Sequence, residues 1–102
     1  MFTGTLTADL LLGDVHSLKG KRAVVRPIVA ELRRKYDVSA AEAGHLDLHR
    51  RALVGVAVVA ADAAHVREVL EACERLVAAH PEVEVLSASL QLLSSTDDPE
   101  ED

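Results

Sequence analysis

Aromatic residues are almost absent from this chain of 102 residues: Phe2 and Tyr36 are the two that it has, and there is no tryptophan. Proteins that bind single-stranded RNA or DNA by base stacking on a sheet present exposed aromatic rings to the bases. The composition therefore argues against base stacking as a mode of nucleic-acid binding.

Cysteine is equally scarce, since Cys73 is the single one. One thiol cannot form an internal disulfide or a thiolate metal cage, and this one falls on the apolar side of a predicted helix, where a buried, inert thiol is expected. The start of the chain lacks a basic segment and contains Asp9, so no signal peptide is predicted. No apolar run approaches the roughly 20 residues of a membrane span. We therefore expect a cytoplasmic protein with no membrane partner.

Charge is spread unevenly along the chain, whose net charge is −6. Residues 15–51 hold nine Lys and Arg against four Asp and Glu, whereas residues 52–102 hold two Arg against eleven acidic residues. Because a local basic segment says more about partners than the overall charge does, anion binding is expected in the first of these regions.

Two helices are predicted from apolar residues that recur at helical spacing. The first follows Ser17, a candidate N-cap, and the second follows Asp62 and stops at His80-Pro81. Pro27 lies inside the first helix, where it removes a backbone hydrogen bond. One kinked helix is favoured, and the alternative is a loose turn followed by a shorter regular helix.

Four strands are predicted around these helices. Alternation of apolar and polar residues indicates a strand over 2–12 with one buried face. Short apolar stretches at 38–43, at 52–61 and from Val83 onward predict the other three. A shift of the apolar phase near Val85-Leu86 predicts a bulge in the last strand.

The order strand, helix, strand, strand, helix, strand predicts an α+β fold of the ferredoxin-like βαββαβ type, a four-stranded antiparallel sheet with two helices on one face. Residues 1–93 are expected to form this single domain, and 94–102 a disordered acidic tail. The third strand is apolar on both sides, so a second subunit is expected to cover part of the open sheet face beside Thr3, Thr5 and Thr7. This hypothesis predicts a homodimer.

Four segments resemble the YlxP-like bacterial family of small domains of unknown function. They are SLKGKR at 17–22, VSAAE at 38–42, HLDLHRRALVGVAVVAAD at 45–62 and HPEVEVL at 80–86. The resemblance covers about residues 1–93 and is most specific in the Ser-Leu-Lys-x-Lys-Arg segment. It implies a ferredoxin-like fold but no established activity.

The same resemblance implies a role near the ribosome or RNA, because genes of the family often lie among bacterial translation genes, beside those for initiation factor two and ribosome-binding factor A. The chain departs from the family pattern at Gly20, where a Glu would complete a capping box with Ser17. Pro27 and His49 are also unusual for the family.

The strongest candidate site is a line of cations on the first helix. At 100° per residue, four of them fall within about 60° of one another along one edge of the apolar face. Phosphate backbones attract such a line with strong salt dependence, while the alternative is a solvated face whose Arg stems cover apolar surface. Glu31 and Glu42 could neutralise part of the charge. The predicted nucleic-acid or anion-binding residues are Lys19, Lys21, Arg22, Arg26, Arg33, Arg50 and Arg51.

Two weaker candidates lie nearby. Ser17 with Lys19 and Lys21 could hold a phosphate or carboxylate at the helix start, against the simpler interpretation of an ordinary capped helix. His45, Asp47 and His49 share a face if their stretch is extended, and they could then bind zinc or a similar ion. If the stretch is a loop, they are ordinary polar residues.

The leading hypothesis is a non-enzymatic binding module, without a cofactor, that associates with RNA or a ribosomal particle through its basic helix. The alternative is a dimeric small-molecule-binding or metabolic accessory protein, with its ligand at the subunit interface beside the open sheet face. A third hypothesis is an enzyme that uses His45, Asp47 and His49 as acid, base and orienting carboxylate, although no nucleophile accompanies them.

Overall fold

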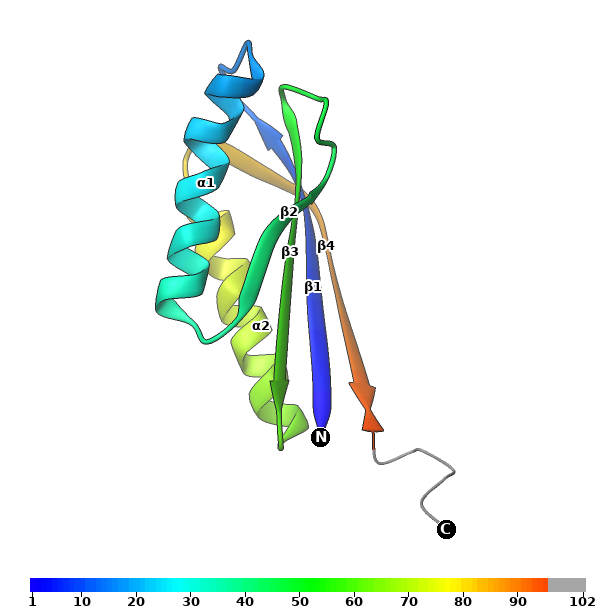
Figure 1. The fold of residues 1–102 in the computed structure, drawn as a ribbon. Helices are drawn as coiled ribbons and strands as arrows, with labels where there is room; N and C mark the ends of the chain where they lie inside the picture. The colour runs from blue at the N-terminus through cyan, green and yellow to red at the C-terminus, as the bar shows by residue number, and fades with distance from the viewer. Residues whose placement is uncertain (96–102) are drawn as a thin grey trace.

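The structure, a computed structural model, describes residues 1–95, so residues 96–102 of the predicted tail lie outside the described residues. Both helices lie on one face of a four-stranded antiparallel sheet with the order β2-β3-β1-β4 (Figure 1). This arrangement confirms the ferredoxin-like prediction. The elements are β1 (Phe2–Leu12), α1 (Leu18–Lys35), β2 (Ser39–Gly44), β3 (Arg51–Ala60), α2 (Ala63–Ala78) and β4 (Val83–Ser94).

The core lies between the sheet and the helices. Alternate residues of β1 and β3 point toward the helices, and the two strands pair so that these residues stand directly opposite one another, as Leu6 does with Val56. The helices complete the core with the apolar stripes that periodicity predicted. The fully buried helical contributors include Val25, Ile28 and Leu32 from α1 and Val66, Leu70, Cys73 and Val77 from α2.

Both helices begin where the sequence predicts. The Oγ of Ser17 accepts a hydrogen bond from the backbone N–H of Gly20 at 2.9 Å, so the cap forms without the Glu of a capping box. The carboxylate of Asp62 caps α2 through the N–H of Ala64 at 3.2 Å. α1 then continues through Pro27 to Lys35, so the first helix is one helix and not a loose turn followed by a shorter one.

The predicted bulge in β4 is present. Leu10 pairs with Val85 while its neighbour Asp9 pairs with Ser87, which leaves Leu86 as an extra residue on β4. Beyond the bulge, β4 pairs with β1 without interruption as far as Ser94.

A glycine in β1 lets α2 pack closely on the sheet. A Cβ on Gly4 of β1 would overlap Cγ1 of Val66 and lie 2.8 Å from Cδ1 of Leu70, so α2 can approach β1 only because that position has no side chain.

Cys73 is buried in α2, and burial raises the pKa of its thiol to about 11. The thiol therefore stays protonated and unreactive at neutral pH, as predicted.

Candidate nucleic-acid interface

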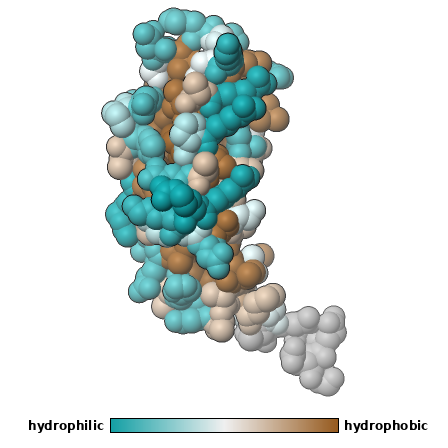
Figure 2. Space-filling view, turned by 60° about the vertical axis from the view of Figure 1, so that its left-hand side comes forward, coloured by the Kyte–Doolittle hydropathy of each residue, from teal (hydrophilic) through white to brown (hydrophobic). Residues whose placement is uncertain are grey.

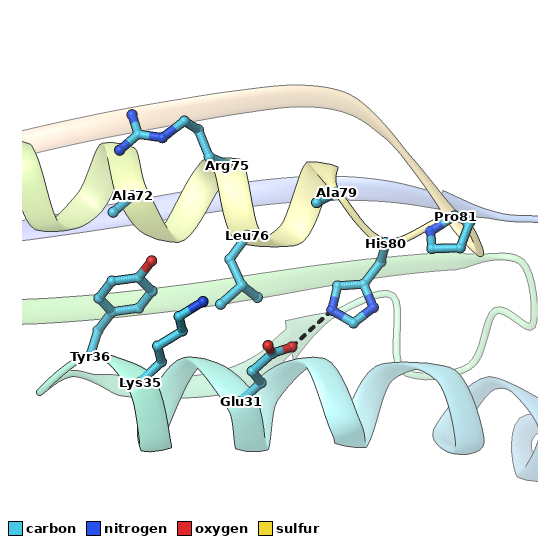
Figure 3. A pocket seen from close by; sticks show the side chains of 9 residues that line it. All are labelled: Glu31, Lys35, Tyr36, Ala72, Arg75, Leu76, Ala79, His80 and Pro81. Carbon is cyan, nitrogen blue, oxygen red and sulfur yellow. Dashed lines mark hydrogen bonds and ion pairs between the residues drawn. The ribbon is translucent and has the colours of Figure 1, made fainter.

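The exposed surface of α1 is strongly cationic. Its 18 residues include seven Lys and Arg, and the only acidic residue among them is Glu31. Oε1 of Glu31 lies 3.1 Å from Nε2 of His80, beyond the end of α2, so its carboxylate is turned toward the second helix (Figure 3). Six of the seven cations are exposed and Lys21 is buried.

Lys19, Arg22, Arg26 and Arg33 form a row of cations along α1, which we call the α1 stripe. The first three are exposed and make no ion pair within residues 1–95. Arg33 donates its Nε to the carbonyl oxygen of Ala40 at 3.0 Å, so the stripe runs along the flank of α1 next to β2. From Lys19 to Arg33 the helix rises about 21 Å.

Lys21 takes no part in this stripe, because its side chain is 2% exposed. Its Nζ donates to the carbonyl oxygens of His45 at 2.6 Å and Leu48 at 2.9 Å. It also lies 2.7 Å from Oε2 of Glu42. That oxygen is buried and accepts no hydrogen bond from residues 1–95. The contact between Lys21 and Glu42 is therefore an ion pair. Lys21 thus ties α1 to β2 and to the loop over residues 45–50.

Sequence reasoning placed Lys21 with the surface cations and missed its structural contacts. The signal was available in the spacing, because Lys21 precedes Val25, Ile28 and Leu32 by four, seven and eleven residues, the repeat of one helical face. Of the two acids that could neutralise the basic segment, Glu42 pairs with Lys21 and Glu31 with His80. Neither one contacts the α1 stripe.

Arg50 and Arg51 contact parts of the molecule other than the α1 stripe. Arg50 donates Nε to the carbonyl oxygens of Leu12 and Gly13, both at 3.0 Å, and so closes the end of β1. Arg51 binds the carboxylate of Asp9 through Nη2 at 2.6 Å and Nε at 3.2 Å. Asp9 points to the sheet face opposite the helices, so Arg51 lies on the far side of the sheet from α1.

The hydrogen bond from Arg51 lowers the pKa of the Asp9 carboxyl below its usual value, against the opposing effect of burial, and a bond from His45 lowers it further. Nε2 of His45 lies 3.4 Å from Oδ1 of Asp9. The backbone of His45 has a positive φ of 57°. Asp9 was not identified from the sequence, because its partnership with Arg51 depends on the register between β1 and β3.

The loop interpretation holds for the stretch that contains His45, Asp47 and His49. His45 turns toward Asp9, while Asp47 and His49 are exposed. Within residues 1–95, no group of three or more His, Cys, Asp and Glu side chains is placed to hold a metal ion. The described geometry therefore does not bring the three residues together as a metal site.

A second polar feature lies between the helices. A cleft of about 510 Å³ is lined by the polar or charged Glu31, Lys35, Tyr36, Arg75 and His80 and by the apolar Ala72, Leu76, Ala79 and Pro81 (Figure 3). It faces solvent on the helical side of the molecule, where hydrophilic residues dominate and hydrophobic ones are visible between them (Figure 2). None of the helices in residues 1–95 is long and apolar enough to cross a membrane.

The fold and the α1 stripe define a small ferredoxin-like α+β domain with one cationic helix. A family model described as "Protein of unknown function (DUF503)" matches residues 3–90. The chain is also 30% identical over 81 residues to the Uncharacterized protein YlxP of Bacillus subtilis (strain 168), an alignment that covers 79% of this chain and 88% of that relative. The chain therefore belongs to this family, and the resemblance predicted from its sequence is confirmed.

Proposed function

We propose that this chain is a non-enzymatic cytoplasmic module that binds the phosphate backbone of RNA, free or within a ribosomal particle, through α1. The observation that carries the proposal is the charge of that helix. Six of its Lys and Arg are exposed, and its one acid is engaged by His80. The exposed set comprises Lys19, Arg22, Arg26, Arg33, Arg34 and Lys35.

The geometry of the α1 stripe supports backbone binding. Lys19, Arg22 and Arg26 need not break an ion pair with residues 1–95 before they contact a phosphate. A cationic row about 21 Å long can follow several successive phosphates of an RNA strand. Because the chain has two aromatic residues and no tryptophan, recognition by base stacking is not part of the proposal.

The direct test is fluorescence anisotropy with a labelled RNA duplex of about 20 base pairs, titrated from ~50 to ~500 mM salt. Each phosphate contact contributes about 0.9 to the slope of log affinity against log salt, by analogy with duplex DNA. The double variant Arg22→Glu/Arg26→Glu should therefore bind at least about tenfold more weakly and lose about two units of slope.

The matched control is Arg67→Glu/Arg75→Glu, which makes the same change of net charge on α2. It should keep the wild-type slope, because those two residues lie outside the α1 stripe. Equal losses for both double variants would mean that overall charge, and not α1, governs binding. Absent or salt-insensitive binding by the wild type would overturn the proposal.

A gradient experiment tests the ribosomal part of the proposal separately. Tagged protein is sedimented with cell extract through sucrose at low and at ~0.5 M salt. Co-migration with ribosomal subunits that is lost at high salt is the expected result. Protein that stays at the top of both gradients would contradict association with ribosomal particles.

A second candidate function is binding of a small organic anion, and the cleft between the helices favours it. Lys35, Tyr36 and Arg75, which line it beside the apolar Ala72 and Leu76, match a ligand that has both a carboxylate or phosphate and an apolar part. Thermal shift with a panel of phosphorylated and carboxylated metabolites tests it. A stabilisation that Lys35→Ala removes, in a protein that does not bind RNA, would favour this function over the first.

A further inference from the structure

β4 is an edge strand that lacks the usual protection against pairing. It has 12 residues, and β1 is its only neighbour within the part of the chain that the structure describes. Edge strands commonly carry charged residues, proline or bulges that prevent pairing with another chain. From Val85 to Ser95 there is no charged residue, proline or glycine. The bulge at Leu86 lies near the start of β4, so residues 87–93 form a regular edge.

The other edge strand, β2, provides a contrast within the same sheet. It has six residues and includes the charged Glu42. Arg33 of α1 donates a hydrogen bond to the carbonyl oxygen of Ala40 in this strand. β2 is therefore short, charged and contacted by a helix side chain, whereas β4 is long and uncharged over most of its length.

The helix-facing side of β4 is also incompletely covered. The corresponding residues of β1 and β3 are buried, but those of β4 stay partly exposed, and Leu92 is 37% exposed. A cavity of about 140 Å³ lies at the same edge between α2 and β4, and the residues that line it are Arg67, Leu70, Leu90, Gln91 and Leu92. Apolar side chains of a neighbouring strand beside β4 would cover the partly exposed helix-facing residues of β4.

We propose that β4 pairs with β4 of a second copy of this chain, antiparallel and about a two-fold axis at Leu90, so that two sheets join into one of eight strands. Over residues 85–95 this edge has no charge, so it meets no like charge when it pairs with itself. Antiparallel self-pairing is also closed, because the same edge is used on both copies and no further copy can add. These two properties select a second copy as the partner.

The register about Leu90 is complementary in size. It places Ala88 opposite Leu92 of the partner subunit, Ser87 opposite Leu93 of the partner subunit, and Ser89 opposite Gln91 of the partner subunit. Each of these pairs joins a small side chain to a larger one, and Leu90 faces its own copy at the axis, where two leucines form an apolar cross-strand contact. Leu93, which is 68% exposed in the single chain, gains Ser87 of the partner subunit as a neighbour on the open sheet face in this arrangement.

This contact differs from the face-to-face homodimer that the sequence suggested. Edge pairing leaves the open face beside Thr3, Thr5 and Thr7 uncovered, whereas a face-to-face contact would bury it. It also leaves α1 clear of the subunit contact, since α1 packs at the β2 side of the sheet (Figure 1).

The test uses paired charges at two exposed positions that face each other only in this register. Ser89→Lys/Gln91→Lys brings two Lys–Lys contacts across the two-fold axis, and Ser89→Lys/Gln91→Glu brings two Lys–Glu contacts. By sedimentation equilibrium from about 1 to 200 µM, the first variant should raise the dimer dissociation constant at least about tenfold. The second should restore it to the wild-type range.

Ser39→Lys/Ala41→Lys, at exposed positions of the other edge strand, is the matched control. It should leave the dimer dissociation constant from sedimentation equilibrium unchanged. Amide hydrogen exchange gives an independent reading, because the N–H groups of residues 87–93 that point away from β1 should exchange more slowly as concentration rises. A wild-type protein that is monomeric at 200 µM, or Lys/Lys and Lys/Glu variants with equal masses, would overturn the proposal. Concentration-independent exchange over 87–93 would overturn it as well.

Discussion

The two helices cover the same face of the sheet but present different chemistry to solvent. α1 carries seven Lys and Arg with one Glu, and α2 carries two Arg with three Glu. Their buried sides differ as well, because α1 places the ammonium group of Lys21 in the interior, whereas the most polar buried side chain of α2 is the thiol of Cys73. The charge of α2 is close to balanced, whereas the excess of cations on α1 is the feature from which its binding role is proposed.

The largest expected effect comes from removing the buried charge of α1. Lys21→Met leaves Glu42 without its partner, and the loss of one member of a buried ion pair costs about 3 kcal/mol or more of unfolding free energy. Urea denaturation measures this change. Lys21→Met/Glu42→Leu should recover the part of the loss that comes from the unpaired carboxylate, since an apolar pair is often as stable as the ion pair, while the carbonyls of His45 and Leu48 stay without their donor. A single variant within about 0.5 kcal/mol of wild type would contradict the structural role of Lys21.

The next largest effect concerns the contact of α2 with β1. Gly4→Ala introduces a Cβ against Val66 and Leu70, and such overpacking costs about 2 kcal/mol. Gly13→Ala is the control, because no atom lies within 4 Å of a Cβ at that position. Thermal unfolding should show a lowered midpoint for the first variant and little change for the second. Equal midpoints would mean that α2 can move away from β1 without cost.

A smaller effect is expected from the proline that interrupts the hydrogen bonds of α1. Pro27 is exposed, so Pro27→Ala restores an N–H donor without disturbing the core and should stabilise the protein by about 1 kcal/mol. The reverse change in α2, Glu71→Pro at an exposed position, should destabilise it by about 3 kcal/mol. If Pro27→Ala weakens the protein in chemical denaturation, the proline has a structural role in α1 that its exposure does not reveal.

The smallest effect lies away from both helices, at Asp9 on the open face. Arg51 lowers the pKa of this carboxyl, so the ionised form stabilises the fold above the usual carboxyl pKa of about 4. That contribution disappears as the pH falls through the lowered pKa, when the carboxylate takes up a proton in the folded state as well. The difference in unfolding free energy between wild type and Asp9→Asn should be constant above about pH 5 and vanish at low pH. A difference that persists at low pH would exclude this origin.

The fold was largely predictable because its signals are local. Alternation over residues 2–12, caps at Ser17 and Asp62 and the phase shift at Leu86 each depend on neighbouring residues, and each feature is present in the structure. Pro27 was the one ambiguous signal. The helix continues through this proline because buried apolar residues on both sides of it pack against the core.

The arrangement of the charges was less predictable, because it depends on contacts between distant parts of the chain. Asp9 and Arg51 are 42 positions apart in the sequence, and their contact can be predicted only when the register of β1 and β3 is known. Lys21 could have been recognised from its helical spacing, but the acceptors at His45 and Leu48 could not. The binding role of the α1 stripe remains a prediction from exposure and charge.

The pairing of β4 with β1 has a consequence for how the domain folds. The first strand and the last are neighbours, paired from Phe2 with Ser94 to Leu12 with Val83, so their contact closes a loop that contains every other element. Such long-range pairing slows folding relative to helical proteins of this size. During synthesis, one edge of β1 stays open until β4 has left the ribosome. The chain therefore completes its sheet only after translation of the domain has ended.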